Sequence, residues 1–172
     1  MDRPELIETG RGLTIRFRGK LLYSDDDPRA SASKRAANAQ LANNTLIFVP
    51  SLGLGYGLKE LLSRLPADCY IFCVEADQEL MAIALKYKPE LPKDPRLFIV
   101  RTEGTDRVLD MAKQLGLWRF RRLKTLPLCA GYHLHRHIYD HMERGLEEEI
   151  RRYWQNKITL IGMARLWAGN LF

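Results

Sequence analysis

The chain has 172 residues, of which 46% are hydrophobic and 28% are charged, proportions typical of a folded globular protein. Its length suits one domain of roughly 150 residues with a short extra element, and its apolar runs are too short to span a bilayer. The amino terminus carries charges where a signal peptide needs an apolar core, so we expect a cytoplasmic protein without membrane contact. The three cysteines, Cys69, Cys73 and Cys129, form no CxxC pair and are expected to be reduced and buried.

The net charge of +6 permits an anionic ligand or partner. The basic residues are spread over several short segments rather than one run, a pattern that does not favour a nucleic-acid partner. The densest segment, residues 118–124, contains four basic and two aromatic side chains. Clustered arginines of this kind can clamp a phosphate or an acidic partner, although a solvated strand edge explains them more simply.

The first 41 residues predict a hairpin followed by a helix. Apolar and polar side chains alternate over residues 13–18, and a second short strand over residues 20–23 follows Gly19. Asp27 and Pro28 then provide a helix start, because an aspartate side chain accepts hydrogen bonds from free amides and proline presets φ. We expect a helix over residues 29–41.

Three apolar runs, at residues 45–50, 69–75 and 97–100, predict strands, and the uninterrupted first run is typical of a strand buried on both faces. Segments with helical periodicity follow each of them, at residues 58–65, 77–88 and 106–115. A further strand over residues 123–129 contains Pro127, which favours an edge position. This alternation predicts an α/β, Rossmann-like fold with a largely parallel sheet flanked by helices, an N-terminal β-hairpin and long C-terminal helices.

The last 40 residues have a mostly helical pattern. We therefore divide the chain into a Rossmann-like α/β domain with its hairpin, residues 1–142, and a helical extension, residues 143–172. The end of this extension is too apolar for a free surface helix, which indicates that it docks on a further domain, pairs with a second copy or folds back on the sheet. The apolar side chains concerned are Ile161, Met163, Leu166, Trp167, Leu171 and Phe172.

The candidate cofactor site is the turn between the first buried strand and its helix. Glycines at this turn let the backbone approach a ligand, and the helix start offers free amides. A carboxylate at the end of the next strand, about 20 residues further on, can accept hydrogen bonds from ribose hydroxyls. The predicted cofactor-binding residues are Gly53, Gly55, Tyr56, Gly57, Glu75 and Asp77.

The glycine spacing, G-x-G-x-G, is closer to a methyltransferase-type turn than to the dinucleotide fingerprint, in which a glycine replaces Leu58. S-adenosylmethionine or a nucleotide is therefore the candidate cofactor. Ser51 departs from this pattern, because methyltransferases usually carry an acid there. A structural role is equally open, in which the glycines allow a tight turn and Glu75 hydrogen-bonds a neighbouring loop.

All four histidines lie within residues 133–141. On a helix, His133, His137 and His141 would share one face, a spacing that allows two rings to bind a metal ion. No third ligand is placed clearly enough for a metal site to be predicted. We also find no nucleophile motif, because Ser51 does not lie in G-x-S-x-G.

Several segments in order resemble the N-terminal domain of the motility-associated-factor glycosyltransferases, bacterial proteins implicated in adding nonulosonic acid sugars to flagellin. They include Gly-Leu-Gly-Tyr-Gly at residues 53–57, Val-Glu-Ala-Asp at 74–77 and Trp-Gln-Asn at 154–156. The other segments are residues 17–28, 131–132, 165–167 and 170–171. The resemblance covers nearly the whole chain.

This resemblance implies an accessory domain that is non-catalytic by itself, because the sugar-transferring chemistry of the family is assigned to a Rossmann-like domain that follows. The implied partners are that downstream domain and flagellin, and a homo-oligomer is a further option. The alternative is a self-contained enzyme, most plausibly an S-adenosylmethionine-dependent methyltransferase or another nucleotide-binding Rossmann-like enzyme.

Overall fold

The computed structural model describes residues 3–87 and 91–169. Near the amino terminus, three antiparallel strands form a small sheet: β1 (Glu5–Thr9), β2 (Gly12–Phe17) and β3 (Lys20–Leu21). The predicted hairpin around Gly19 corresponds to β2 and β3. The strand β1, which was not predicted, pairs with β2 along its whole length and is partly exposed.

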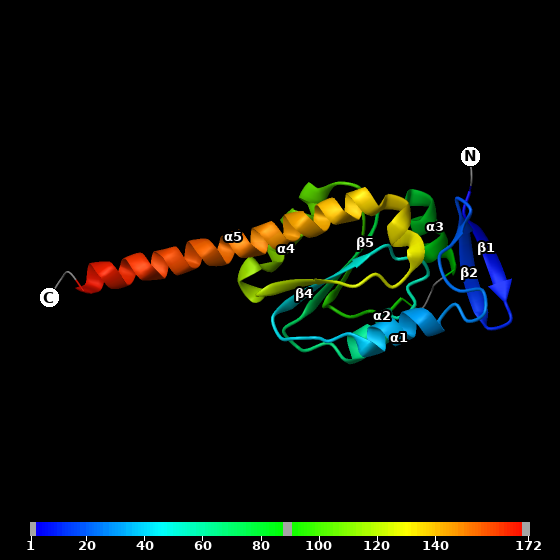
Figure 1. Cartoon of the computed structure of the whole chain (residues 1–172), viewed down its shortest axis with the longest axis horizontal. Coiled ribbons are helices and arrows are strands. Elements are labelled where there is room, and N and C mark those ends of the chain that lie inside the picture. The colour runs from blue at the N-terminus through cyan, green and yellow to red at the C-terminus, as the bar shows by residue number, and fades with distance from the viewer. Residues whose placement is uncertain (1–2, 88–90, 170–172) are drawn as a thin grey trace.

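A second sheet consists of four parallel strands, in the order β6-β5-β4-β7. The strands are β4 (Thr45–Pro50), β5 (Tyr70–Glu75), β6 (Leu97–Arg101) and β7 (Arg122–Thr125). Numbered within this sheet, the order is 3-2-1-4, which is that of the first four strands of a Rossmann fold. The predicted α/β fold class is confirmed (Figure 1).

Helices cover both faces of the parallel sheet. The helices are α1 (Ala30–Asn38), α2 (Leu58–Ser63), α3 (Gln78–Tyr87), α4 (Thr105–Leu115) and α5 (Arg136–Gly169), with the short 3-10 helices η1 (Leu117–Arg119) and η2 (Ala130–His135). Ile47 and Val49 pack in one core with side chains of α1, α2 and α3, whereas Leu46 and Phe48 pack with α4 and α5. Because successive side chains of β4 enter different cores, every residue of the strand is buried and all but Thr45 are apolar.

The strand β7 lies at the edge of the sheet, as Pro127 predicts, but it ends at Thr125 rather than at residue 129. The Leu126 amide still donates a hydrogen bond to the Phe48 carbonyl (2.8 Å). Pro127 has no N–H with which to continue the ladder, so the chain leaves the sheet there. The predicted strand is too long because Leu126 and Leu128 continue its apolar pattern.

The carboxy-terminal end of the fold is one helix of 34 residues, not several. Gly145 lies inside it without interrupting it, and a Cβ atom there would come within 3.1 Å of Thr105 Cγ2, so the glycine allows α4 to pack closely. The first half of α5 covers the sheet with Tyr139, Met142, Leu146 and Ile150. The predicted domain division after residue 142 falls within this packed helix and stays a prediction.

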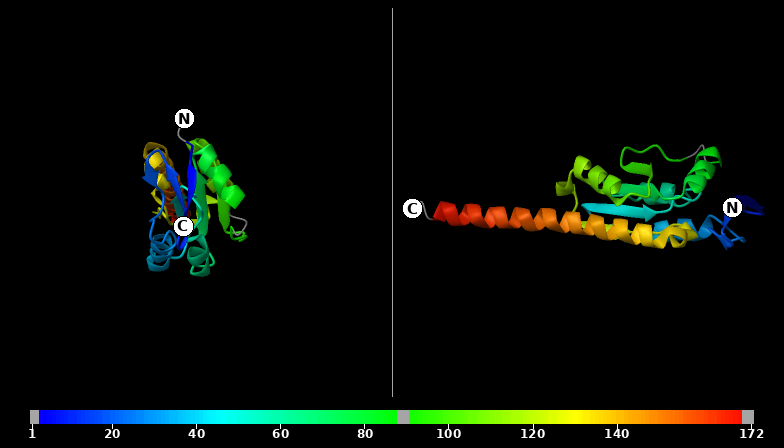
Figure 2. Two further views of the ribbon diagram at one scale, coloured as in Figure 1. Left: turned by 90° about the vertical axis from the view of Figure 1, so that its right-hand side faces the viewer. Right: turned by 90° about the horizontal axis from the view of Figure 1, so that it is seen from above.

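The second half of α5 extends away from the α/β unit as an isolated rod (Figure 2). Its large apolar side chains are exposed, among them Leu166 (69%) and Trp167 (77%). Leu171 and Phe172, which belong to the predicted apolar segment, lie outside the described residues, as does residue 88 at the end of a predicted helix. Within the described ranges, no helix combines the length and the apolar character needed to cross a membrane.

Candidate functional site

The loop after Pro50 and the carboxylate of Glu75 lie side by side, as the candidate site requires. In the parallel register Pro50 is opposite Val74, so both strands end at the same edge of the sheet. The Ser51 amide donates to the Val74 carbonyl (2.8 Å), and Ser51 then turns the chain with a positive φ of 65°. This conformation, which is uncommon for residues other than glycine, aims the loop back over the end of β5.

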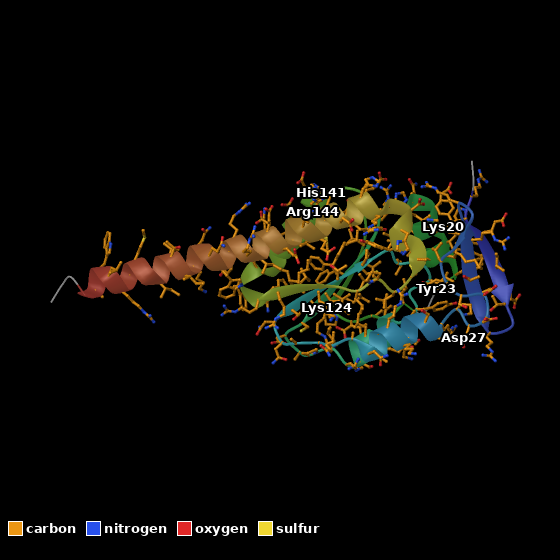
Figure 3. All side chains as sticks on the ribbon, viewed as in Figure 1. Lys20, Tyr23, Asp27, Lys124, His141 and Arg144 are labelled. Atoms are coloured by element: carbon orange, nitrogen blue, oxygen red, sulfur yellow. The ribbon has the colours of Figure 1, made fainter. Side chains whose placement is uncertain are left out.

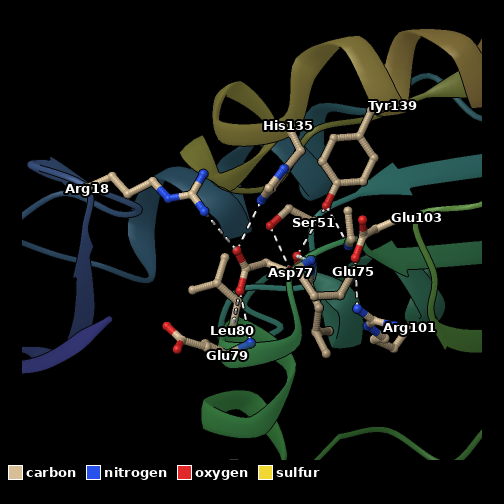
Figure 4. Close-up of polar contacts among 12 residues, drawn as sticks. Arg18, Ser51, Glu75, Asp77, Glu79, Leu80, Arg101, Glu103, His135 and Tyr139 are labelled. Carbon is tan, nitrogen blue, oxygen red and sulfur yellow. Dashed lines mark hydrogen bonds and ion pairs between the residues drawn. The ribbon is translucent and has the colours of Figure 1, made fainter. Parts of the chain in front are cut away.

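The Glu75 carboxylate is fully buried and uses both oxygens inside the protein (Figure 4). Oε2 accepts hydrogen bonds from Ser51 Oγ and the Leu52 amide, both at 2.9 Å, and Oε1 accepts from the Asp77 amide at 3.0 Å. Tyr139 Oη also donates to Oε1, at 3.2 Å. Burial and the nearby charge of Glu75 raise the pKa of Tyr139, which keeps this hydroxyl protonated and able to donate.

A second buried side chain, Tyr23, fills the space beside the glycine turn. Its hydroxyl accepts a hydrogen bond from the Leu54 amide (2.8 Å) and lies 3.5 Å from the Leu52 carbonyl. Its ring packs against Tyr56, with 4.8 Å between the ring centroids. Burial raises the pKa of Tyr23 well above its ordinary value, so the hydroxyl is neutral. Tyr23 therefore binds a turn amide that a ligand would otherwise contact.

The glycines of the turn accommodate the protein's own chain. A Cβ atom on Gly53 would lie 2.5 Å from Tyr23 Oη, and one on Gly57 would lie 2.8 Å from the Ala32 carbonyl oxygen in α1. At Gly55 the obstacle would be the side chain of Leu91, at 2.7 Å. All three glycines have positive φ, and residues 51–58 are buried throughout. These glycines are required by a tight turn and by close packing.

The structure thus brings the predicted residues together without opening a crevice between them. The ribose role predicted for Glu75 needs a free carboxylate oxygen, but Ser51, the turn amides and Tyr139 already engage both. This arrangement agrees with the structural role considered above, in which the glycines allow a tight turn and Glu75 hydrogen-bonds a neighbouring loop. Cofactor binding by these residues stays a prediction.

An open hollow of about 710 Å³ does lie at the same edge of the sheet, beyond the ends of β5 and β6. Of the predicted residues, only Asp77 borders it. The hollow is lined by Phe17, Arg18, Ala76, Asp77, Gln78, Glu79, Arg101, Glu103 and His135. Four chain segments converge there: the hairpin, the start of α3, the end of β6 and η2.

Asp77 is the polar centre of this hollow (Figure 4). Its Oδ1 accepts hydrogen bonds from the Glu79 and Leu80 amides, at 2.9 and 3.2 Å, and so caps α3. Its Oδ2 lies 3.0 Å from His135 Nε2 and 3.8 Å from the Arg18 guanidinium. Partial burial by itself would raise the pKa of Asp77, but the hydrogen bonds from His135 and the two amides outweigh it and lower the pKa.

Arg18 occupies an unusual position for an arginine. Arg18 has a φ of 50° and forms, with Gly19, the two-residue turn between β2 and β3. Asparagine followed by glycine is the preferred pair in such a turn. Left-handed backbone at a residue other than glycine is destabilising by about 1 kcal/mol or more, and such positions cluster at functional sites. The departure from asparagine before Gly19 is therefore visible in the sequence itself.

The remaining functional side chains had no usable sequence signal. Tyr23, His135 and Tyr139 lie 29 to 64 residues from the groups they contact. The histidine cluster is divided, since His135 ends η2 and contacts Asp77, whereas His137 and His141 lie exposed on α5. Over residues 3–87 and 91–169, no three metal-ligating side chains are grouped so as to hold an ion.

The cysteines are free and buried, as predicted. Cys129 lies beside the glycine turn, with its Sγ 3.5 Å from Ser51 Oγ. Burial raises the pKa of the Cys129 thiol to about 11, so it is neutral near pH 7. A neutral buried thiol is a poor nucleophile, and we assign it a packing role.

Comparisons with known proteins give no family. No family model matches the chain. An uncharacterized protein of Treponema pallidum (strain Nichols) is 29% identical over 170 residues, which are 98% of this chain and 30% of that protein. The chain therefore spans less than a third of the length of this curated relative.

Among solved structures, the chain is similar to a spermidine synthase in complex with the transition-state analogue AdoDATO. The match has a TM-score of 0.49 and 20% identity, over 64% of this chain and 39% of the synthase. A spermidine synthase from Thermotoga maritima matches with a TM-score of 0.43 and 20% identity, over 63% of this chain and 40% of that one. None of these three proteins is described as a glycosyltransferase or a motility factor.

The lowered pKa of Asp77 predicts a pH-dependent contribution to stability. A carboxylate whose folded-state pKa lies below its unfolded value stabilises the fold above the unfolded pKa, and the effect is lost as pH falls through the folded pKa. At pH 7 we expect Asp77→Asn, which retains an oxygen for capping α3, to unfold at a lower urea concentration than the wild type. The difference should shrink as pH falls below the ordinary value of 3.8.

Urea unfolding followed by circular dichroism between pH 2 and pH 7 measures this effect. Asp110→Asn, an exposed change on α4, is the matched control and should follow the wild type throughout. A difference between Asp77→Asn and the wild type that stays constant down to pH 2 would contradict the assignment.

Proposed function

We propose that this chain is a non-catalytic accessory domain, of the kind found at the amino terminus of motility-associated-factor glycosyltransferases, which positions a further domain of the same polypeptide. The observation that carries the proposal is the filled glycine turn. Glu75 and Tyr23 already hold the Leu52 and Leu54 amides, the groups with which a Rossmann-type turn would hold a cofactor. A domain built in this way offers its fold as a scaffold.

The second half of α5 supports a docking role. Successive residues of a helix are turned by about 100°, so the apolar side chains of this segment point in all directions around its axis. They are Ile158, Leu160, Ile161, Met163, Leu166 and Trp167, all exposed. Figure 3 shows the side chains along this end of α5 standing clear of the α/β unit. A helix that is apolar all round is normally buried in the core of a protein. We infer that another folded domain surrounds this segment.

A further domain fits this segment better than the other predicted partners do. A two-fold contact between two copies of α5 would cover one side of the rod and leave the opposite apolar side chains in water. The length of the Treponema relative, of which this chain matches 30%, leaves room for further domains in such a protein. Flagellin remains the proposed protein to which the whole polypeptide would transfer a sugar. This domain would then help to position flagellin.

A second candidate function is binding of S-adenosylmethionine or a nucleotide by this domain. The hollow beside Asp77 favours it, because ligands of open α/β sheets bind outside the carboxyl ends of the strands. Arg18, 51% exposed and only 3.8 Å from Asp77, offers further donors to a ligand there. Such a ligand would have to bind without the turn amides or displace Tyr23 from them.

Calorimetric titration separates the two functions. With S-adenosylmethionine, S-adenosylhomocysteine and ATP at millimolar concentration, the accessory role predicts no saturable heat. Binding in the hollow beside Asp77 predicts micromolar affinity that is weakened by Arg18→Gln and retained by Gly10→Asp, since Arg18 lines the hollow and Gly10 has open space around it. Micromolar binding with that pattern of variants would contradict the accessory role.

The docking role of α5 predicts that its outer half can be altered without affecting the α/β unit. We expect the double variant Ile161→Lys, Leu166→Lys to keep the urea midpoint of the wild type. It should also abolish concentration-dependent self-association, which exposed apolar surface promotes. Sedimentation velocity and urea unfolding measure the two effects.

The control for this experiment is Leu146→Lys, which buries a charge in the core under the same helix and should unfold the unit. A lower urea midpoint for the double variant would mean that its residues pack on the α/β unit, which contradicts docking elsewhere. A wild-type chain that stays monomeric at millimolar concentration would contradict it as well. A discrete dimer at nanomolar concentration would favour the second-copy alternative.

A further inference from the structure

A second hollow, of about 460 Å³, lies between the start of β7 and the middle of α5. It is at the other end of the sheet from the glycine turn, because Arg122 pairs with Thr45, the first residue of β4. Its lining consists of Arg121, Arg122, Leu123, Glu147, Ile150, Arg151, Trp154 and Gln155. Three guanidinium groups from two separate elements therefore border one concave surface.

The position of Arg121 is fixed by its surroundings. The Arg121 amide donates to the Asn44 carbonyl (2.7 Å), and Asn44 Nδ2 donates to the Arg119 carbonyl (3.2 Å), so one residue holds the segment that enters β7. The Arg121 guanidinium lies over the ring of Trp154, 3.4 Å from its centroid. Trp154 in turn donates through Nε1 to the Phe120 carbonyl. The cation is thus held in place before any ligand arrives.

The charges around this hollow are unbalanced. Three guanidinium groups face one carboxylate, that of Glu147. In the described part of the chain, neither Arg121 nor Arg122 has a carboxylate oxygen within 4.0 Å. Arg151 pairs with Glu148 at 3.6 Å, but both side chains are more than half exposed, so this pair is weak. An anion bound among the three arginines would neutralise their mutual repulsion.

Protection of an edge strand explains only part of this arrangement. Charged side chains on β7, such as Arg122 and Lys124, discourage pairing with another chain. That purpose requires neither a guanidinium stacked on an indole nor a third arginine supplied by α5. The three arginines converge on a common hollow instead of being spaced along the strand edge. This arrangement indicates a binding site.

We propose that the hollow between β7 and α5 binds the phosphate group of a small phosphorylated molecule, through Arg121, Arg122 and Arg151. The planar guanidinium fork matches phosphate oxygens in a bidentate manner, and a volume of several hundred Å³ suits a small ligand. The arginines surround one concavity instead of forming a long basic stripe, which favours a compact ligand over a nucleic acid. The site is independent of the accessory role proposed above.

Titration with pyrophosphate, followed by two-dimensional ¹H–¹⁵N NMR at low chloride, tests this site. We expect saturable shifts of the Leu123 amide and the Trp154 indole N–H. The double variant Arg121→Gln, Arg122→Gln should weaken binding at least tenfold. The double variant Arg11→Gln, Arg16→Gln removes the same charge from exposed positions of the hairpin and should leave binding unchanged.

Three results would overturn the proposal. Shifts that do not saturate would show that no site exists, and equal weakening by both double variants would show that only net charge matters. Saturable binding of an oligothymidylate of ten nucleotides, without any response to pyrophosphate, would show that this surface binds nucleic acid instead. Spectra of both double variants report directly whether the fold is retained.

Discussion

The Glu75 carboxylate is the constraint on which the functional edge of this fold depends. A buried charge without partners is destabilising by several kcal/mol, so its hydrogen bonds determine the positions of its neighbours. Ser51 Oγ, the Leu52 amide and Tyr139 Oη all donate to it. One side chain therefore joins the ends of β4 and β5 to the start of α5 and holds the glycine turn closed.

Because of this constraint, the glycine turn of the Rossmann-type sheet is filled by side chains of the protein itself. The place where the fold normally holds a ligand contains the protein's own Tyr23 and Glu75. Among the surfaces open to other molecules are the hollow beside Asp77, the arginine-lined hollow at β7 and the outer half of α5. The filled glycine turn and the exposed apolar helix are the two observations that support the proposed role in positioning another domain.

The sequence was informative wherever a local pattern has one physical meaning. The Thr45–Pro50 strand was predicted to the residue, because six consecutive buried positions leave no alternation to misjudge. Pro127 correctly indicated an edge strand, since proline cannot donate in a ladder. The strand β1 was missed because its exposed Glu5 and Glu8 obscure the pattern.

The contents of the turn could not be predicted in the same way. The G-x-G-x-G spacing is compatible with a ligand or with close packing of the chain on itself, and the choice depends on Tyr23 and Tyr139, which are distant in sequence. The continuity of α5 through Gly145 was missed for a similar reason, because the close approach of α4 that this glycine permits appears only in three dimensions.

Hydrogen exchange of the Leu52 and Leu54 amides in the ligand-free protein tests the central claim most directly. If Glu75 and Tyr23 hold these amides, both should exchange as slowly as the amides of β4 and β5, through global unfolding. Exchange as fast as that of exposed loops, with protection gained only when a cofactor is added, would contradict the account and identify an open binding turn.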